Sequence, residues 1–595
     1  MDIFQFITLA GGVAVFLYGM LIMGEGLQQA TSDKMQNLLA SLTSNLFKAV
    51  ALGAVVTAVI QSSSATTVMV VGLVNSGIMA LNQAVGVIMG ANIGTTITAW
   101  ILSLSGVEGN SFLLRLLNPS GFSPILAVIG IYLIFSKKDH RKSIGMIFFG
   151  FALLMMGMEV MAQSVAPLQE SPKFTSLFLL FKNPLLGVLA GAVLTAIIQS
   201  SSASVGILQA LASTGGVTWG AAIPIIMGQN IGTCVTALLS GIGAKKNAKR
   251  AAILHLLFNS VGTVIVFAFF YLVNAFKGFS FLDNPVSVVG IATFHTAFNL
   301  AVTVILLPFH NQLVSLSKLI IPDQAPKEIG ALVTEHDEIL QMLDPRFLES
   351  PGFALTKAFE AMKKMHQVCS QALITTASML DDASSDKLAQ VSDHEEVVDQ
   401  FEDALQSYLL QISQQTLSNQ EALELNIMMH TINDLERMSD HTVHVAELLV
   451  KQKKMGDNFS GAAKNELKIM LDAVIETITI TGEYLQDQKL NRSADIEALE
   501  EIIDNLEIDL QDRHIERLKK GYCTVEAGFM YSDILAALER ISDYCTNISF
   551  YFSDVMDGKY DRHQYKSRMQ QNNSHFNESF ATYRDKYALP ALEGA

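Results

Sequence analysis

The stretch AVIQSSSATT, Ala58 to Thr67, places a glutamine and three consecutive serines inside a strongly apolar region, and AIIQSSSASV, Ala196 to Val205, repeats it. Shifting the chain by 138 positions aligns Gly53 to Ala99 with Gly191 to Ala237 without a gap, and 23 of the 47 aligned positions are identical. Low-complexity apolar sequence does not easily give that agreement. The repeat therefore indicates an internal duplication, which is the construction expected of a secondary transporter.

Composition divides the chain into two parts. Of its 595 residues 50% are apolar and 16% charged, and a mean hydropathy of +0.35 is too high for an ordinary soluble enzyme of this length. Up to Pro322 the chain carries 15 Lys and Arg against 8 Asp and Glu, whereas the remainder carries 25 against 48. The first part has apolar runs of membrane-spanning length, and the second has apolar residues at helical spacing. We expect an all-α fold, with a polytopic membrane part followed by a cytoplasmic helical part.

Basic loops orient the predicted spans. KKDHRK (Lys137 to Lys142) and KKNAKR (Lys245 to Arg250) are the densest Lys/Arg clusters between apolar runs, and such loops stay on the cytoplasmic side. Between them, Leu185 to Leu211 forms two arms of roughly 13 to 15 residues, too short as helices for a hydrocarbon core of about 30 Å. We expect a re-entrant hairpin that opens from outside. The same argument makes Phe47 to Ser76 a hairpin that opens from inside, so the two copies form inverted repeats.

Full-length spans complete the predicted topology. A first span is entered from outside near the N-terminus, and the acidic part of the chain ends in the cytoplasm. We place repeat one at about residues 1–136 and repeat two at about 143–310, within a transmembrane transport domain of residues 1–320. The later spans are expected at Asn82 to Leu102, Ser111 to Phe135, Ile144 to Met161, Ala221 to Leu239, Ala251 to Val273 and Val286 to Pro308.

The QSSS letters supply hydrogen-bonding groups where each hairpin turns. Non-helical backbone at membrane depth persists only where it lines a polar cavity or is buried in protein. Helix N-termini offer N–H donors to an oxyanion, while carbonyl and hydroxyl oxygens suit a hard cation such as Na⁺. Neither copy contains Asp, Glu, Lys, Arg or His, although a cationic substrate or a proton relay would be expected to use one. One serine cluster alone is more often structural, but its repetition in register favours a shared oxyanion and sodium site.

Paired QSSS hairpins, each followed by G-x-N-I-G-T, resemble the type II sodium-phosphate cotransporter family over most of residues 1–310. In that family these segments build the phosphate and sodium sites. Electrogenic vertebrate members are associated with an extra intramembrane aspartate that neither copy contains, so the resemblance leaves the sodium-to-phosphate stoichiometry open. The positions that match the family's sites are Gln61, Ser62, Ser63, Ser64, Asn92, Thr95, Gln199, Ser200, Ser201, Ser202, Asn230 and Thr233.

A third pattern, H-x-x-F-N, occurs twice near the end of the membrane part. It places His255 with Asn259, and His295 with Asn299, one helical turn apart on one face. Interhelical hydrogen bonding is the favoured interpretation over direct substrate contact.

The acidic part contains its own duplication. HEEVVDQFE (His394 to Glu402) matches LEEIIDNLE (Leu499 to Glu507), and DLERMSDH (Asp434 to His441) matches ALERISDY (Ala537 to Tyr544). We expect a pair of three-helix bundles with two E-x-x-x-D pairs in each. Carboxylates four residues apart share one helix face and repel each other unless a cation compensates. A solvated face is the alternative, but the repetition favours a metal site for Fe, Mn or Zn, with ligands Glu395, Asp399, Glu436, Asp440, Glu500, Asp504, Glu539 and Asp543.

This second pattern resembles the PhoU family of phosphate-signalling regulators over roughly Lys357 to Phe552, which implies regulation by phosphate status. We predict a linker and lead-in helix at 321–356, a PhoU-like domain at 357–556 and a mobile tail at 557–595.

The two resemblances imply a sodium-coupled inorganic phosphate symporter of the bacterial inner membrane. The alternatives are a phosphate exporter, a transporter of another oxyanion, or a phosphate-responsive signalling receptor. The expected partners are phosphate, Na⁺, membrane lipid and a cytoplasmic phosphate-signalling protein, with no nucleic acid. We expect no enzyme, because no nucleophile–base constellation, phosphate loop or nucleotide fingerprint is found.

Overall fold

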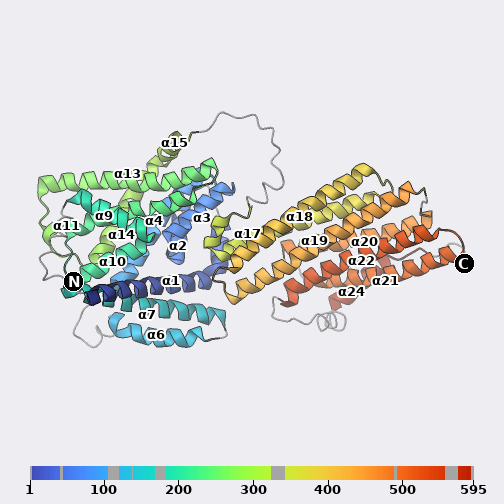
Figure 1. The fold of residues 1–595 in the computed structure, drawn as a ribbon, viewed down its shortest axis with the longest axis horizontal. Coiled ribbons are helices and arrows are strands. Elements are labelled where there is room, and N and C mark those ends of the chain that lie inside the picture. The colour runs from blue at the N-terminus through green and yellow to red at the C-terminus, as the bar shows by residue number, and fades with distance from the viewer. Residues whose placement is uncertain are drawn as a thin grey trace. The chain divides into compact units, whose positions relative to one another are not determined.

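The computed structural model is helical in the residues that it describes, which are 3–40, 45–104, 119–136, 138–167, 183–322, 342–456, 459–487, 492–555 and 574–590. Within these ranges, strand pairing is limited to one antiparallel bridge between Thr218 and Pro285. The chain forms two compact units (Figure 1). The first, here called the membrane unit, is Met1–Gly330 with Asp344–Phe353 and Thr416–Ser418, and the rest of the chain is the second unit.

The helices of the membrane unit match most of the expected topology. Six are long and apolar enough to cross a membrane, and each overlaps an expected span. The expected span at Ser111 to Phe135 lies partly outside the described residues, which show only its C-terminal portion as α6. The helices are α1 (Ile3–Ala40), α2 (Leu46–Ile60), α3 (Ser63–Asn75), α4 (Leu81–Ser103), α6 (Pro119–Ile134), α7 (Asp139–Val165), α9 (Pro184–Ile198), α10 (Ser201–Ser213), α11 (Trp219–Gly232), α12 (Cys234–Ser240), α13 (Lys246–Lys277), α14 (Val288–Leu306) and α15 (His310–Ile320).

Within each copy, small residues let two helices approach each other closely. An added Cβ at Gly94 of α4 would lie 2.7 Å from the Thr57 Cβ of α2, and an added Cβ at Gly232 of α11 would lie 2.7 Å from the Thr195 Cβ of α9. Helix contacts through small residues are typical of membrane proteins, where water does not drive apolar association. The pairs α2–α4 and α9–α11 therefore form equivalent packing units in the two copies.

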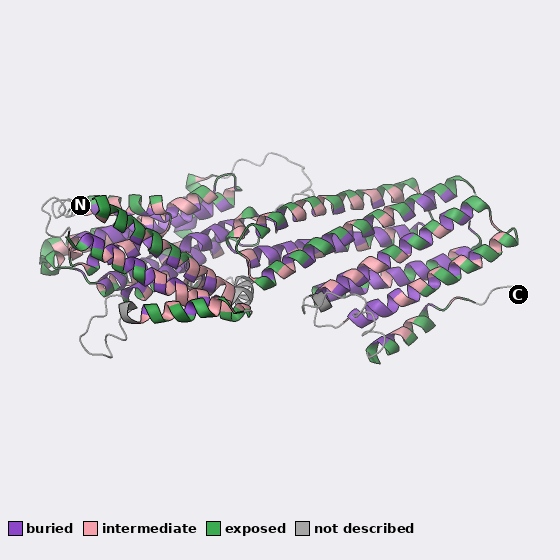
Figure 2. Cartoon of the chain, turned by 60° about the horizontal axis from the view of Figure 1, so that its bottom comes forward, coloured by how far each residue is buried: buried purple, intermediate pink, exposed green. Residues whose placement is uncertain are grey.

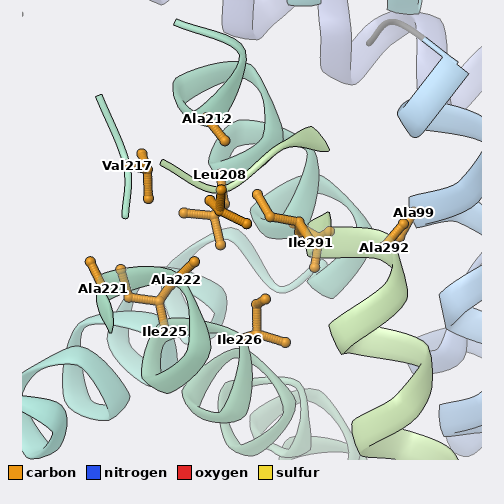
Figure 3. Close-up of a cluster of buried hydrophobic side chains, with 12 residues drawn as sticks. Ala99, Leu208, Ala212, Val217, Ala221, Ala222, Ile225, Ile226, Ile291 and Ala292 are labelled. Carbon is orange, nitrogen blue, oxygen red and sulfur yellow. The ribbon is translucent and has the colours of Figure 1, made fainter. Parts of the chain in front are cut away.

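Apolar side chains join the second copy to neighbouring helices. In Figure 3, Leu208 of α10, Ile226 of α11 and Ile291 of α14 meet in one buried cluster, which also includes Ala99 of α4. By contrast, α13 exposes Phe269 and other large apolar side chains, as a lipid-facing helix must. Figure 2 shows exposed positions along the outer faces of the helices. The core thus fixes α10, α11 and α14 against one another.

The second unit is built from long amphipathic helices, and none of its described residues belongs to a candidate membrane span. Helix α19 packs against α18 and α22, and α22 also packs against α20 and α21. Buried Leu and Ile side chains fill the spaces between them, each contributing roughly 1.5–3 kcal/mol. The helices are α17 (Pro351–Ser378), α18 (Ser385–Ser413), α19 (Asn419–Lys454), α20 (Gly461–Gln486), α21 (Ser493–Lys519), α22 (Val525–Phe550) and α24 (Ser574–Lys586).

The prediction of a mobile tail from residue 557 is wrong for α24 and the residue after it. Phe576 is buried against Ala494 and Ala498 of α21, and Ser579 Oγ donates to Asp495 Oδ1 at 2.5 Å. Tyr587 Oη donates to a carboxylate of α20. The physical reason is an apolar face at Phe576, Phe580, Tyr583 and Tyr587, which the polar composition of the tail concealed. The remainder of the expected tail, 557–573 and 591–595, lies outside the described residues.

Candidate functional site

Both predicted hairpins break at their glutamine. Gln61 and Gln199 are the non-glycine residues with positive φ among the described part of the chain, and both have φ 59° and ψ 20°. The Gln61 N–H donates to the Thr57 carbonyl at 2.8 Å, and the Gln199 N–H donates to the Thr195 carbonyl at 2.7 Å. A left-handed residue with a side chain costs about 1–2 kcal/mol. The same local strain is therefore built into both copies.

The first serine of each QSSS motif caps the helix that follows. Ser62 Oγ accepts from the Ala65 N–H at 3.1 Å, and Ser200 Oγ accepts from the Ala203 N–H at 3.2 Å. Each serine has extended backbone geometry, as an N-cap requires. The remaining N–H groups of the first turn, with their partial positive charge, are thus presented at the starts of α3 and α10.

The two helix starts meet. Ser63 Oγ lies 3.5 Å from Ser201 Oγ, and Ser64 Oγ donates to the Gln199 carbonyl at 3.4 Å. Ser63, Ser64 and Ser201 are buried, as is Ser202 in the first turn of α10. Two helix N-termini that converge with hydroxyls between them form an arrangement suited to an oxyanion. The structure therefore brings together residues that the sequence predicted to share a site.

The two glutamine side chains do not have equivalent surroundings. Gln61 is 8% exposed; its Oε1 accepts from Thr98 Oγ1 at 2.9 Å, and its Nε2 donates to the Ala58 carbonyl. Gln199 is exposed, and within the described ranges its carboxamide has no hydrogen-bond partner. Thr236, the equivalent of Thr98, has a buried Oγ1 without a partner in the described structure. One copy has formed a contact that the other lacks.

Three other predicted residues bond within their own helices. Asn92 Nδ2 donates to the Ile88 carbonyl, and Thr95 Oγ1 donates to the Ala91 carbonyl, each at 3.0 Å. Thr233 Oγ1 donates to the backbone of α11 at 2.9 Å. These groups are buried, but these hydrogen bonds do not connect the two copies.

Asn230 makes the interhelical bonds that its equivalent Asn92 lacks. Its Nδ2 donates to Asn299 Oδ1 at 2.8 Å, and its Oδ1 lies 3.4 Å from His295 Nε2. Asn259 of the other H-x-x-F-N motif donates to Cys234 Sγ at 3.4 Å. The interhelical bonding expected for these motifs is confirmed for both asparagines and for His295, which together with Asn299 contacts a predicted site residue. Neither ring nitrogen of the buried His255 has a partner among the described residues.

Thr98, the partner of Gln61, and its unpaired equivalent Thr236 were not predicted from the sequence. Nor was the bond from Gln229 Nε2 to Ser204 Oγ, at 2.9 Å, which joins α11 to α10. The signal for the two threonines was present, because they are identical residues at equivalent positions of the duplication. Their polarity alone did not separate them from the neighbouring Thr95, Thr96 and Thr233.

The predicted carboxylate pairs of the second unit form crowded acidic faces. Burial, and then the neighbouring Asp440, raise the pKa of Glu436 to about 7. Burial, and then Asp543, likewise raise the pKa of Glu539 to about 7. The pKa of Glu395 and of Asp399 is raised, chiefly by burial and also by nearby carboxylates. No group of three or more His, Cys, Asp or Glu in the described residues has the geometry of a metal site, so metal binding stays a prediction.

Comparison with known protein families divides the chain into a membrane part and a second part, as the structure does. Residues 15–163 and 168–290 match the profile described as Na+/Pi-cotransporter, and residues 362–449 and 467–551 match the PhoU domain. The first profile covers the QSSS helix breaks of both copies. The second matches twice, as the duplication of the acidic part indicates.

Three relatives align with different shares of the chain. "Putative inorganic phosphate export protein YjbB" of Escherichia coli K12 is 24% identical over 94% of this chain and 99% of its own length. "Uncharacterized protein YqeW" of Bacillus subtilis is 28% identical over 52% of this chain and 96% of its own. Human "Sodium-dependent phosphate transport protein 2B" is 39% identical over 15% of this chain and 14% of its own.

No solved structure matches the chain. The six candidate spans agree with the first family profile, and the second unit has none among its described residues. The chain is therefore a multi-pass membrane protein with a domain of the Na+/Pi-cotransporter family, followed by two PhoU domains in a soluble helical region.

Proposed function

We propose that this protein moves inorganic phosphate across the bacterial inner membrane, and that the anion binds between the starts of α3 and α10. The observation that carries the proposal is the 3.5 Å approach of Ser63 Oγ and Ser201 Oγ. Each helix N-terminus carries the equivalent of about half a positive charge. Two such ends with free N–H donors offset a phosphate without a fixed cationic side chain, which both copies lack.

The proposed topology makes the site reachable from both sides. Helices α2 and α3 have 15 and 13 residues, as do α9 and α10, so each arm is about 20 to 22 Å long and does not span a core of about 30 Å. The breaks then lie near the membrane midplane as two re-entrant hairpins of inverted repeats. The N-terminus is outside, and the second unit, with two three-helix bundles, is on the cytoplasmic side of the membrane, as the basic loops are.

Export is the direction that the comparisons favour. A relative that matches 94% of this chain is named a putative phosphate export protein, which supports export over the sodium-driven uptake expected from the sequence. A membrane potential that is negative inside also favours exit of an anion, by about 2.3 kcal/mol per charge and 100 mV. An outward phosphate gradient and this potential drive export without a second energy source.

Sodium-coupled uptake is the second candidate. The 39% identity to a human sodium-dependent phosphate transport protein supports it over a short segment. Carbonyl and hydroxyl oxygens of Gln61 and Ser62 at the first helix break, and of Asn92 and Thr95 in α4, are hard ligands of the kind that Na⁺ accepts. Sodium bound together with phosphate would reverse the preferred direction, because the sodium gradient points inward.

The PhoU region is proposed to adjust transport to the phosphate status of the cell. Its carboxylate faces are the proposed sites for Fe, Mn or Zn, and its surface is proposed to bind a cytoplasmic phosphate-signalling protein. Elemental analysis after incubation of the full chain with each metal tests the first point. Metal retained by the native protein and lost in Glu436→Gln with Glu539→Gln is expected; no retained metal contradicts it.

Flux through proteoliposomes tests the transport proposal. Radiolabelled phosphate is loaded inside or outside, with sodium on neither side, on one side or on both. Gln61→Ala and Ser201→Ala are expected to reduce phosphate flux at least about tenfold. Ser315→Ala is the control, since its exposed hydroxyl bonds only to the backbone of α15. Competition with arsenate and sulfate defines the anion.

The outcomes separate the candidate functions. Sodium-independent flux supports an exporter, whereas flux that needs sodium on the phosphate side supports a symporter. Phosphate binding without flux supports a signalling receptor. Unchanged flux in both site variants contradicts the assignment of the helix starts as the phosphate site.

A further inference from the structure

We propose that Thr98 and Thr236 are positioning residues that hold Gln61 and Gln199 alternately, one in each of two conformations of the membrane unit. In the structure, Thr98 Oγ1 donates to Gln61 Oε1 at 2.9 Å, while Gln199 is exposed and the buried Thr236 Oγ1 has no partner among the described residues. In the other conformation, Thr236 holds Gln199 and Gln61 is released. The proposal deepens the proposed function and rests on its site.

The backbone gives the two glutamines the same starting point. Both have φ 59° and ψ 20°, and both donate their N–H to a threonine four residues earlier. Both are followed by a capping serine. A difference in the main chain at the glutamines therefore does not explain why one carboxamide is bound and the other is free.

The backbones of the helices that carry the threonines do not explain the difference either. Thr98 belongs to α4, which is continuous from Leu81 to Ser103. Thr236 belongs to α12, which follows α11 directly at Thr233. Thr233 keeps helical backbone angles, φ −59° and ψ −26°, and its N–H donates to the Gln229 carbonyl at 3.2 Å, so α11 and α12 form one span. The two copies therefore differ in which glutamine is paired with its threonine, on equivalent backbones.

The unpaired Thr236 hydroxyl indicates which conformation each threonine substitution should favour. A buried donor without a partner disfavours the conformation that contains it, and a new hydrogen bond offsets this. Removing the Thr98 hydroxyl is therefore expected to favour the other conformation, and removing the Thr236 hydroxyl is expected to favour the one described here. One hydrogen bond corresponds to a population shift of about fivefold.

Hydrogen–deuterium exchange of the purified full chain tests the proposal without phosphate or sodium. Thr98→Val is expected to raise exchange around Gln61 and to lower it around Gln199, by about threefold or more. Thr236→Val is expected to do the opposite. Thr98→Ser and Thr236→Ser retain the hydroxyl and are expected to restore the native pattern. Thr→Val conserves shape, and Gln61→Asn, which is too short to reach Thr98, supplies a second variant if Thr98→Val does not fold.

Opposite shifts in the two variants distinguish positioning from a general loss of stability. If both valine variants raise exchange in both copies, or if the serine variants behave as the valine variants, the proposal is wrong. Since no phosphate is present, this result is independent of the flux experiment. Loss of the proposed phosphate site would leave the exchange pattern intact, and an absent exchange pattern would leave the phosphate site untouched.

A second inference comes from residues 344–350, here called the strap, which belong to the membrane unit although the linker precedes them. Phe347 is fully buried, and an added Cβ at Gly72 of α3 would lie 3.0 Å from its ring. Asn75, the last residue of α3, donates from Nδ2 to Asp344 Oδ2 at 2.8 Å. The strap therefore packs against the end of α3 opposite to Ser63.

Charged and polar groups fasten the strap to the second copy as well. Arg346 Nε donates to the Ser240 carbonyl at the end of α12 at 2.9 Å, and Arg346 Nη1 pairs with the 2%-exposed Asp344 at 2.8 Å. Asn75 Oδ1 accepts from the Lys245 N–H at 2.8 Å. A buried ion pair with these additional hydrogen bonds has a defined geometry, and removing one partner leaves the other charge uncompensated.

We infer that the strap restrains α3 and α12 and thereby lets the PhoU region slow transport. Helix α17 begins at Pro351, directly after the strap, and its residues from Ala354 belong to the second unit. A shift of α17 thus acts on the strap through a continuous stretch of chain. The strap contacts α3, which begins at the proposed site, and α12, which carries Thr236.

Release and locking of the strap test this inference in proteoliposomes. Asp344→Ala and Phe347→Ala are expected to increase phosphate flux about threefold or more and to raise hydrogen exchange in α3. Paired Asn75→Cys and Asp344→Cys substitutions, cross-linked by oxidation, are expected to reduce flux reversibly with a reductant. Asp382→Ala is the control, because that exposed aspartate pairs with Lys453 within the second unit.

The cross-linked double-cysteine protein still tests the inference if the release variants, Asp344→Ala and Phe347→Ala, do not fold. Unchanged or reduced flux in the folded release variants, or full flux in the cross-linked protein, contradicts a restraint. Hydrogen exchange in α3 is measured without phosphate, so it reports on the strap even if the transported ion is a different one.

Discussion

The two copies of the duplicated membrane segment share their backbone breaks but not their side-chain contacts. Gln61 is enclosed and bonded to Thr98, whereas Gln199 is exposed and Thr236 is unpaired in the described structure. The helices that carry the two threonines have equivalent backbones, because Thr233 between α11 and α12 keeps helical angles. Residues identical in both copies thus set the position of the break, while the surroundings of each copy decide which contacts form.

The same lesson applies to the asparagines of the duplicated segment. Asn92 bonds to its own helix, whereas Asn230 is held by Asn299 and lies beside His295. The H-x-x-F-N motif of α14 lies outside the duplicated segment, and neither copy contains such a motif. A duplicated sequence therefore gives equivalent positions, but a helix outside the repeat makes one position more constrained than the other.

The largest expected effect tests what the copies share. Gly94→Val and Gly232→Val introduce a Cβ that would lie 2.7 Å from the facing threonine Cβ in each copy. Overpacking typically costs about 1–3 kcal/mol, and a branched side chain at a backbone contact is expected to exceed that range. The melting temperature of the detergent-solubilised protein should fall strongly and by similar amounts in both variants.

Gly11→Ala is the control for these variants, because an added Cβ there meets nothing within 4 Å. Its melting temperature should stay at the native value. A strong loss in only one of the two valine variants would show that the packing units α2–α4 and α9–α11 are not equivalent.

The second effect tests where the copies differ. Asn230→Ala removes the bond to Asn299 and leaves buried polar atoms unpaired, at a cost of about 1–3 kcal/mol. Asn92→Ala removes only a bond to its own helix backbone, and alanine's higher helix propensity offsets part of that loss. Thermal unfolding without sodium and phosphate should show a larger loss for Asn230→Ala. Equal losses of stability in the two variants would contradict the proposed difference between Asn230 and Asn92.

These contacts show how far the sequence predicts the structure. The position of both breaks follows from QSSS, because hydroxyls and a carboxamide recur in register within apolar sequence. The pairing state does not follow, because Thr98 and Thr236 are the same residue type at equivalent positions and only their surroundings differ. The membrane spans follow from apolar run lengths, whereas the pairing of each glutamine depends on packing in three dimensions.

Long-range contacts account for other differences between prediction and structure. Asp344 and Phe347 lie in a segment expected to be part of the linker and lead-in helix, and no local pattern indicates that they pack against α3. By contrast, the apolar face of α24 was present in the sequence at Phe576, Phe580 and Tyr583 and was overlooked within a polar tail. The contacts of Asp344 and Phe347 can be found only from the three-dimensional fold. The packing face of α24 can be predicted from the helical spacing of its apolar residues.

The third effect separates backbone strain from side-chain bonding at the breaks. Glycine adopts the left-handed conformation without a Cβ clash, so Gln199→Gly is expected to stabilise the fold by up to about 1 kcal/mol. Gln61→Gly relieves the same strain but loses the bond from Thr98, which contributes about as much. Thermal unfolding should place Gln199→Gly above Gln61→Gly by roughly 1 kcal/mol, and the reverse order would contradict the difference in pairing.

The smallest effect returns to a feature that the copies share. Ser62→Ala and Ser200→Ala each remove one N-cap bond, of 3.1 and 3.2 Å, and a lost cap costs about 1 kcal/mol. Because the caps have the same geometry, the two variants should lower the melting temperature by the same amount. Replacement by aspartate, which also caps helices, should recover the stability while placing a negative charge beside the proposed anion site. Ser62→Asp and Ser200→Asp are therefore expected to be stable but to bind phosphate weakly, and full phosphate binding in both would place the anion elsewhere.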